Sequence, residues 1–432
     1  MRFNTLDQWL EWQAVLHGKA IDLGLDRVRQ VAERLGLQQI AGRVITVAGT
    51  NGKGSTVAAY EQWLRSAGFS VASYTSPHLL KYNERIKSNQ QPVSDSLLCE
   101  AFAAVEAARG EIKLTYFEYG TLAALHLIQR WQPDYAILEV GLGGRLDAVN
   151  IVDADLVHLT PIGIDHQAWL GDDREQIGYE KAGVLRDGIA VVLNDPDPPQ
   201  TVLTEIERRH CSCLRLGQDY SLVEIENGHA VWQGEGLRLP LDSVLPGLHQ
   251  LHNLAGVVAG LSRLLDLKAY TAEQLREYFN GLQLAGRLQR VASPLTCALY
   301  VDVGHNPDAA RALAASLGAI KPTRGKLVVL LGMLEDKQPD LFVEALGSVV
   351  DQWWLTTLDC DRGLDAERLK SRIGPQIDID QTFDNVASAL DSALSSLGNQ
   401  DIMLVTGSFI TVELLLRAVP DSVELNTYGS KH

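Results

Sequence analysis

Glycine, lysine and hydroxyl side chains are concentrated in one short stretch that could bind phosphate. Glycines let the backbone close around an anion, and a lysine beside a helix start adds a full positive charge to the partial charge of the unpaired N–H groups. Such a combination predicts a site for the phosphates of a nucleotide. The stretch reads Gly49-Thr50-Asn51-Gly52-Lys53-Gly54-Ser55-Thr56.

The flanking residues place this stretch between a strand and a helix. Val44–Ala48 is an apolar run rich in β-branched residues, and from Val57 onward apolar residues recur at helical spacing. The common P-loop pattern is matched imperfectly, because Gly54 stands where a hydroxyl residue is expected and the hydroxyl follows at Ser55. A tight strand-to-helix turn without a ligand is the alternative, but Lys53 favours nucleotide binding.

Polar residues also follow three further predicted strands. In open parallel sheets, ligands bind at the carboxyl ends of the strands, so these positions are candidate site residues. The polar segments are Thr75–Leu79 after the first strand, Gly141–Asp147 after the second and Asp165-His166 after the third.

Three side chains in this part of the chain bear on metal binding. Glu139 lies inside an otherwise apolar strand, and because an unpaired buried carboxylate is costly we expect it to face a metal or a cation. Neutral imidazole makes His166 a reasonable metal ligand, although a lone histidine is more often a loop or surface residue. Lys181 lies in a predicted helix, where its pattern alone indicates a solvated cation.

Composition narrows the class of protein. The chain has 432 residues, of which 46% are hydrophobic and 21% charged, so it is globular and too long for a single core. Its net charge of −16 disfavours nucleic acid or an anionic membrane as the main partner. Five scattered cysteines are too few for a disulfide framework, and neither an apolar leader nor a membrane-spanning run is visible, so we expect a cytoplasmic protein.

The pattern of the chain predicts an α/β fold in two domains. Residues 1–290 would form a P-loop ATPase domain with a mostly parallel sheet, within which 201–245 alternates weakly, as short antiparallel strands would. Composition and rhythm change at about 290 to 297. From 297 to 432 strands and helices alternate, which predicts a Rossmann-like α/β domain whose first and last strands also end in polar loops.

Several segments together resemble the signatures of the folylpolyglutamate synthase family, within the Mur ligase superfamily. The segments occur in the family's order, and the resemblance covers essentially the whole chain. They are Val47–Ser55, Thr75–Leu79, Leu138–Ala148, Asp165-His166, Glu180–Gly183 and Asp302–Pro307.

The resemblance implies an ATP-dependent amide ligase. Members of the family transfer the γ-phosphoryl group of ATP to a substrate carboxylate, and the amino group of L-glutamate then attacks the acyl phosphate. This chemistry depends on positioning and on charge neutralisation by Mg²⁺ and lysine. By the same resemblance the small-molecule substrates are dihydropteroate, reduced folates and L-glutamate.

Carried over by position, the resemblance assigns ATP to the phosphate stretch and to three later residues, so that ATP would lie between the two domains. The implied catalytic residues are Lys53, His166, Lys181 and His305. The implied ATP-binding residues are Thr50, Asn51, Gly52, Lys53, Gly54, Ser55, Asn253, Arg287 and Asp302.

The resemblance also implies two magnesium sites. Their ligands would be Ser76, Glu139, His166 and Lys181. Lys181 matches a lysine that the family carbamylates, which turns a cation into an anionic oxygen ligand and replaces the solvated-cation interpretation. A monovalent cation such as K⁺ is a further expected cofactor.

Three segments resemble the dihydropteroate-binding segments of bacterial members that also act as dihydrofolate synthase. Phe117 could stack on a flat pterin and Asp22 could hydrogen-bond its amino and ring nitrogens, although core packing is the alternative for Phe117. The implied dihydropteroate-binding residues are Ile21, Asp22, Leu23, Thr115, Tyr116, Phe117, Glu118, Leu146, Asp147 and Ala148.

Two alternative functions share parts of this pattern. A Mur-type peptidoglycan ligase would use the same nucleotide site with a UDP-sugar acid, but the pterin segments favour the folate enzyme. A nucleotide-gated binding protein without ligase activity is possible for any P-loop protein, yet no guanine-reading N-K-x-D motif is present. No repeat or zipper pattern is visible, so we expect a monomer.

Overall fold

The computed structural model describes residues 2–19, 21–226, 229–243, 245–321 and 324–419; residues 420–432, the end of the predicted C-terminal domain, lie outside this part. The contacts divide the chain into two compact units, Met1–Val244 with Gln250–Leu282 and Leu245–His249 with Gln283–His432. The division falls a few residues before the predicted 290 to 297, because the strand Gln289–Val291 already pairs within the second unit. This two-domain α/β architecture is the predicted fold class.

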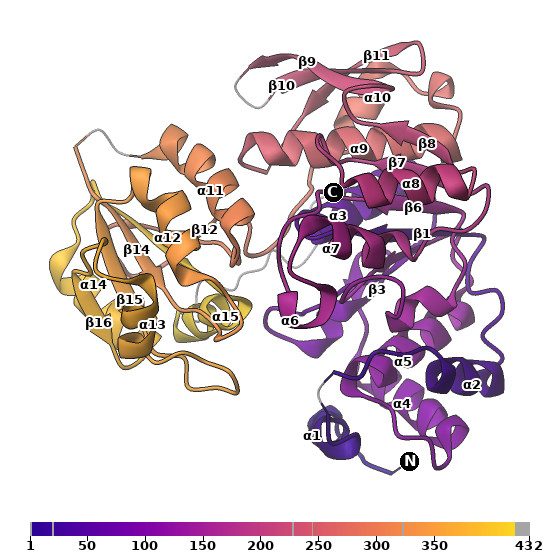
Figure 1. The fold of residues 1–432 in the computed structure, drawn as a ribbon, viewed down its shortest axis with the longest axis horizontal. Helices are drawn as coiled ribbons and strands as arrows, with labels where there is room; N and C mark the ends of the chain where they lie inside the picture. The colour runs from indigo at the N-terminus through magenta and orange to yellow at the C-terminus, as the bar shows by residue number, and fades with distance from the viewer. Residues whose placement is uncertain (1, 20, 227–228, 244, 322–323, 420–432) are drawn as a thin grey trace, which may run out of the picture. The chain divides into compact units, whose positions relative to one another are not determined.

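The first unit is built on an eight-stranded sheet (Figure 1). Its spatial order is β4-β3-β2-β5-β1-β6-β7-β8. The six strands β2, β5, β1, β6, β7 and β8 run parallel, whereas β3 and β4 pair antiparallel. The order places the ends of β2, β5, β1 and β6 side by side, which is where the sequence predicted site residues. The strands are β1 Arg43–Ala48, β2 Val71–Tyr74, β3 Ile86–Ser88, β4 Gln91–Pro92, β5 Tyr135–Glu139, β6 Leu156–Leu159, β7 Ala190–Leu193 and β8 Ser212–Arg215.

Helices cover both faces of this sheet. On one face α4 and α5 lie side by side, and α1 and α2 pack against them (Figure 1). On the other face α3 packs on β1, β2 and β5, and Tyr60 of α3 hydrogen-bonds Nδ1 of His158 on β6 at 3.0 Å. The helices are α1 Leu6–Leu16, α2 Asp26–Leu35, α3 Lys53–Ser66, α4 Asp95–Arg109, α5 Tyr116–Trp131, α6 Gln167–Leu170, α7 Arg174–Ala182, α8 Gln200–Arg208, α9 Leu248–Leu264 and α10 Ala272–Glu277, with 3₁₀ turns η1 Tyr82–Arg85, η2 Ala148–Ile151 and η3 Leu267–Ala269.

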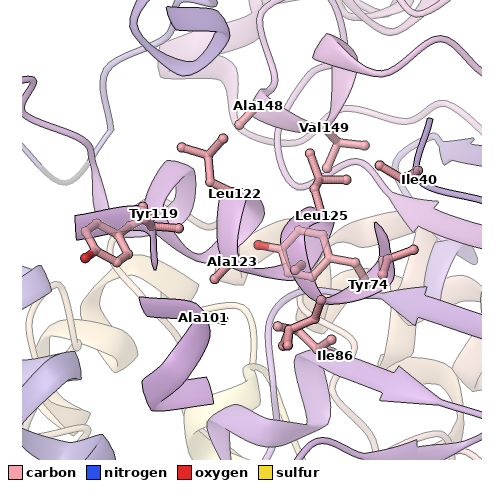
Figure 2. Packing of buried hydrophobic residues seen from close by; sticks show 14 of the residues in the cluster. Ile40, Tyr74, Ile86, Ala101, Tyr119, Leu122, Ala123, Leu125, Ala148 and Val149 are labelled. Atoms are coloured by element: carbon pink, nitrogen blue, oxygen red, sulfur yellow. The ribbon is translucent and has the colours of Figure 1, made fainter. Parts of the chain in front are cut away.

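One hydrophobic core of the first unit is built around α5. Figure 2 shows Leu122, Ala123 and Leu125 of α5 in one cluster with Tyr74 of β2 and Ile86 of β3. These side chains are completely buried. Burial of apolar area at about 25 cal/mol per Å² is the main stabilising term, so the core fixes α5, and with it the N-terminal turn of that helix, against the sheet.

The segment 201–245 differs in part from its prediction. Its first residues form helix α8 and strand β8 of the main sheet, and only the later residues form a three-stranded antiparallel sheet, β11-β10-β9. The alternating interpretation failed at α8 because Val202 and Ile206, four residues apart, are both buried, which is the spacing of a helix face. The three strands are β9 Tyr220–Glu226, β10 His229–Gly234 and β11 Leu237–Asp242.

The second unit contains a six-stranded sheet in the order β12-β13-β17-β14-β15-β16, parallel except for β12. The predicted alternation of strands and helices is confirmed, and α15 follows β17 in addition. In the described residues of both units, no helix combines the length and apolar character needed to cross a membrane. The elements are β12 Gln289–Val291, β13 Ala298–Val301, α11 Pro307–Ile320, β14 Leu327–Leu331, α12 Pro339–Leu346, η4 Gly347–Val349, β15 Gln352–Thr356, α13 Ala366–Ile373, β16 Gln381–Phe383, α14 Val386–Ser396, β17 Ile402–Thr406 and α15 Phe409–Ala418.

Gln13 of α1 generates a stability prediction. Its side chain is 1% exposed, and neither its amide nitrogen nor its amide oxygen has a hydrogen-bond partner among the residues that the structure describes. Because an unsatisfied buried polar group costs about 1–3 kcal/mol, we expect Gln13→Leu to raise the free energy of unfolding by about 1 kcal/mol or more. Urea denaturation at neutral pH measures the change. The exposed Gln30→Leu is the matched control and should leave stability nearly unchanged; a destabilised Gln13→Leu would contradict the prediction.

Candidate active site

The loop after β1 closes tightly around the start of α3. Gly49 has φ +149° and Gly52 has φ +89°, and a Cβ on Gly49 would lie 1.8 Å from Oγ1 of Thr160. A Cβ on Gly52 would lie 2.7 Å from Oδ1 of Asn253, so α9 brings this predicted ATP residue against the loop. Glycine is required at both positions, because a side chain would displace the neighbour that the loop contacts.

The two hydroxyl residues of the loop are placed differently. Thr50 Oγ1 donates to the carbonyl of Gly163 at 3.0 Å and accepts from its N–H at 3.1 Å, which ties the loop to the segment that leads to His166. Ser55 lies in the first turn of α3 and is 3% exposed. Thr50 therefore holds the shape of the loop with its hydroxyl, and its main-chain N–H donates to the carbonyl of Pro161 at 2.9 Å.

Two lysine side chains converge on one carbonyl of this loop. Lys53 Nζ donates to the carbonyl oxygens of Gly49 and Thr50, both at 3.1 Å, and Lys181 Nζ donates to the same Gly49 oxygen at 2.8 Å. Lys181 is 5% exposed, so it is a buried group and not the solvated cation that its pattern alone indicated. Burial, reinforced by the neighbouring charge of Lys53, lowers the pKa of Lys181 to about 7.

The end of β5 joins the loop to the segment after β2. Glu139 is 5% exposed and stands opposite Val47 in the pairing of β5 with β1. Its Oε2 accepts the N–H of Ser76 at 3.2 Å, so the structure brings together two of the predicted metal ligands. Their carboxylate and hydroxyl oxygens are hard donors of the kind that Mg²⁺ prefers.

His166 lies at the beginning of α6 with a left-handed φ of +54°. Its N–H donates to Oδ1 of Asp165 at 2.8 Å. Within the described ranges no three His, Cys, Asp or Glu side chains gather as a preformed metal cluster. The predicted ligand set contains only two residues of those types, so its membership stays a prediction.

Arg27 of α2 joins two of the predicted dihydropteroate segments. Its Nε donates to both carboxylate oxygens of Glu118 at 2.8 and 2.9 Å, and its Nη1 donates to Oδ2 of Asp22 at 2.6 Å. Lys19, by a hydrogen bond, and Arg27, by its charge, hold the pKa of Asp22 below its ordinary value despite some desolvation. Glu118 also accepts the N–H of Thr115 at 2.8 Å, which completes the capping box at the start of α5.

The third predicted dihydropteroate segment, Leu146–Ala148, is linked to the start of α5 through the loop after β5. Oδ2 of Asp147 accepts the N–H groups of Gly141 and Leu142 at 3.0 and 2.8 Å, and its Oδ1 accepts that of Val149 at 2.9 Å. A Cβ on Gly141 would lie 2.6 Å from the ring of Phe117, which therefore packs on this loop. Asp147 is buried, and burial raises its pKa to about 6, so its observed role is to shape the loop.

The remaining members of these segments are buried or half-buried. Phe117 lies 6.1 Å from the ring of Tyr74, tilted by 31°, and Tyr116 beside it is half-buried. Ala148 is part of the core under α5 (Figure 2). Ile21, Leu23 and Leu146 are half-buried.

In the second unit, the predicted ATP and catalytic residues gather at the end of β13. Asp302 accepts the N–H groups of Leu288 and Gly304 at 2.8 and 2.7 Å. His305 Nδ1 donates to the carbonyl of Val303 at 2.9 Å. The guanidinium of Arg287 lies 5.7 Å from the ring centre of Phe409, which also contacts His305. The structure thus brings Arg287, Asp302 and His305 into one neighbourhood.

Sequence reasoning did not find Arg27. A signal was present, because the three predicted dihydropteroate segments contained three carboxylates, Asp22, Glu118 and Asp147, and no cation. A pair of partly buried carboxylates needs a positive partner, and Arg27 is the nearest arginine in the sequence to Asp22. The bond to Glu118, however, joins residues 91 positions apart, which spacing alone does not reveal.

Comparison with known proteins identifies the family. Residues 47–261 match the Mur ligase middle domain and residues 286–409 match the Mur ligase glutamate ligase domain. The dihydrofolate synthase/folylpolyglutamate synthase of Escherichia coli K12 is 41% identical over 419 residues, 96% of each chain. The chain belongs to the dihydrofolate synthase/folylpolyglutamate synthase family. The Haemophilus influenzae member is 40% identical, over 95% of this chain and 96% of its own.

Solved structures of this family have the same fold. The E. coli FolC structure in complex with DHPP and ADP superposes with a TM-score of 0.89 at 39% identity, covering 96% of this chain and 97% of that one. A bifunctional folylpolyglutamate synthase/dihydrofolate synthase with Mn, AMPPNP and L-glutamate bound gives a TM-score of 0.86 at 39% identity, covering 96% of this chain and 98% of that one. The resemblance found in the sequence is therefore confirmed at the level of the family.

Arg27 generates a prediction about this site in the synthase. Removing it leaves the Glu118 carboxylate, whose side chain is 5% exposed, without its cation. We expect Arg27→Met to lower the free energy of unfolding by about 2–3 kcal/mol, measured by denaturant titration.

Two further variants test whether the loss of stability comes from leaving the buried Glu118 carboxylate without a cation. The double variant Arg27→Met/Glu118→Gln should recover part of the loss, because glutamine can still accept the Thr115 N–H without a buried charge. Arg34→Met on the same helix is the matched control and should cost less, because Arg34 donates to the backbone carbonyls of Ala108 and Arg109 and forms no ion pair with a described carboxylate. Equal losses in Arg27→Met and Arg34→Met would contradict the account.

Proposed function

We propose that this chain is an ATP-dependent ligase with two activities. It adds L-glutamate to dihydropteroate, which forms dihydrofolate, and it adds further γ-linked glutamates to reduced folates. The observation that carries the proposal is the 41% identity to the E. coli enzyme over 96% of both chains. Relatives with DHPP and ADP, and with Mn, AMPPNP and L-glutamate, are consistent with pterin, nucleotide and amino-acid substrates.

The proposed reaction proceeds in two displacements. A carboxylate oxygen of the pterin substrate attacks the γ-phosphorus of ATP, the bond to the bridging oxygen breaks, and ADP leaves with the electron pair. The amino group of L-glutamate then attacks the carbonyl carbon of the acyl phosphate, loses a proton and expels phosphate. Phosphoryl transfer depends mainly on alignment and on charge neutralisation, so residues that position anions matter most.

ATP and a divalent metal are the cofactors of this family, and the residues of this chain fit both. The loop from Thr50 to Ser55, with Asn253 beside it, would hold the triphosphate, and Lys53 would place a cation on it. In the second unit, Arg287 and Asp302 would contact the nucleotide and His305 would take part in catalysis. These assignments rest on position in the family's motifs.

Ser76, Glu139 and His166 would hold the metal. A bound Mg²⁺ neutralises charge on the phosphate oxygens as the phosphoryl group moves. Glu139 supports the assignment, because it is a buried carboxylate at a strand end whose Oε2 accepts an N–H of the segment that contains Ser76.

We further propose that Lys181 is carbamylated and supplies an oxygen ligand to a second Mg²⁺. Only a neutral amine can add carbon dioxide, and a buried lysine beside Lys53 is held in surroundings that disfavour the charged form. In that reaction the amine nitrogen bonds the carbon of CO₂ and releases one proton, which leaves a carbamate anion. A monovalent cation such as K⁺ stays a further prediction, as does the monomeric state.

The pterin substrate would lie where the three predicted segments meet. Phe117 offers a ring at the loop after β5, and Asp22 and Glu118 share Arg27 nearby. Because the carboxylate of Asp147 already accepts three backbone N–H groups, we propose that its segment contributes shape and main-chain contacts. Ile21, Leu23, Thr115, Tyr116, Leu146 and Ala148 would complete the walls.

A product assay tests the function. With ATP and L-glutamate, we expect phosphate release that depends on dihydropteroate and, in separate reactions, on tetrahydrofolate. Mass spectrometry should detect dihydrofolate from the first acceptor and a diglutamate from the second. A UDP-sugar acid is the control acceptor, and turnover with it alone would favour a peptidoglycan ligase. Nucleotide binding without any amide product would favour a binding protein.

Lys181 generates a separate prediction. We expect Lys181→Ala to lower kcat by about 100-fold or more, the scale of losing one electrostatic contributor in an active site, and added bicarbonate should not restore it. Steady-state phosphate release measures the change. Lys370→Ala, an exposed lysine at the end of α13, is the control and should be unaffected. Full activity in Lys181→Ala would remove the carbamate from the mechanism.

A further inference from the structure

Arg85 is a buried arginine without a carboxylate partner. It ends η1 and is 8% exposed. Its Nε donates to Nδ1 of His78 at 2.9 Å, and its guanidinium lies 5.0 Å from the ring centre of Tyr82 and 5.7 Å from that of Tyr116. Among the residues that the structure describes, no carboxylate oxygen lies within 4.0 Å of it.

The other buried arginine of the first unit is held quite differently. Arg109 is 7% exposed, and its Nε and Nη2 donate to the two carboxylate oxygens of Glu106 at 2.6 and 2.9 Å. Its Nη1 donates to two backbone carbonyls. Burying a cation is costly unless an anion compensates it, and aromatic faces offset only part of that cost. Arg109 has that anion within the chain, whereas Arg85 would have to receive one from a ligand.

The position of Arg85 indicates which ligand anion would pair with its guanidinium. On one side the arginine touches Tyr116, which lies next to Phe117 in a predicted dihydropteroate segment. On the other side it bonds His78, in the same short segment as Ser76, whose N–H bonds Glu139. Arg85 therefore lies between the pterin segment and the proposed metal residues. The carboxylate that receives the phosphoryl group must occupy the space between those two sites.

We propose that Arg85 binds the carboxylate of the pterin substrate that the reaction phosphorylates. The proposal rests on the proposed function. A guanidinium can pair with a carboxylate through two parallel N–H···O bonds, which fixes the plane of the carboxylate and aims one oxygen at the γ-phosphorus. Arg85 gives up no proton in this step. His78 and the rings of Tyr82 and Tyr116 hold the guanidinium in its orientation while the substrate exchanges.

Binding of two ligands tests the proposal. Dihydropteroate and its carboxamide analogue differ only in the group that Arg85 would contact, so titration calorimetry in the presence of ADP and Mg²⁺ compares them without turnover. We expect wild-type enzyme to prefer the acid. Arg85→Met should lose about 10- to 100-fold in affinity for the acid, the scale of a charge-assisted pair, and bind the carboxamide as before.

Control variants distinguish a direct contact between Arg85 and the substrate from a general effect of removing a buried arginine. Arg109→Met removes the other buried arginine and should leave the ratio of the two affinities unchanged, even if its stability falls. If Arg85→Met does not fold, Arg85→Lys keeps the charge but not the fork, and its smaller loss should again be confined to the acid.

The outcomes distinguish a failure of the Arg85 proposal from a failure of the proposed ligase function. An unchanged ratio in Arg85→Met, or an equal loss for both ligands, would overturn the role of Arg85 and leave the ligase function standing. Failure of wild-type enzyme to bind either ligand would overturn the proposed function itself.

Discussion

Two lysine side chains share one backbone carbonyl, and much of the site depends on that arrangement. The oxygen of Gly49 accepts from Lys53 and from Lys181, which come from the start of α3 and the end of α7. Two ammonium groups so close repel each other, and one of them is buried. Burial, together with the nearby charge of Lys53, lowers the pKa of Lys181 to about 7 and so disfavours the charged form of Lys181. In the proposed mechanism the two amines would have separate roles, a carbamate at Lys181 and a phosphate contact at Lys53.

The wider pattern is a set of cations that the chain itself does not neutralise. In the described residues, Lys53 and Arg85 have no carboxylate oxygen within 4.0 Å, although the chain carries a net charge of −16. Elsewhere arginines such as Arg109 and Arg27 are paired with glutamates. Unpaired cations near the ends of neighbouring strands are suited to anionic substrates, because a triphosphate and a carboxylate can supply the missing charge. The strand order of the first unit places the loops that follow β2 and β1, with Arg85 and Lys53 soon after them, at the same end of the sheet.

Much of the fold and part of the site could be predicted from the sequence. The P-loop was visible because its glycines, lysine and flanking apolar runs are local signals. Glu139 was found because a carboxylate in an apolar strand breaks the pattern. The residues that sequence reasoning misjudged depend on distant partners: Lys181 looked solvated, yet it bonds a carbonyl 132 positions away. For α8 the error was local, because Val202 and Ile206 were assigned the period of a strand.

The account depends most on the claim that the two lysines at Gly49 differ in chemical state. Carbon-13 NMR of the enzyme with labelled bicarbonate and Mg²⁺ tests it directly, because a carbamate carbon on the protein is distinguished from free bicarbonate. The account predicts one protein-bound carbamate resonance in wild-type enzyme that persists in Lys53→Ala and disappears in Lys181→Ala. Absence of that resonance from wild-type enzyme, or its survival in Lys181→Ala, would contradict the account.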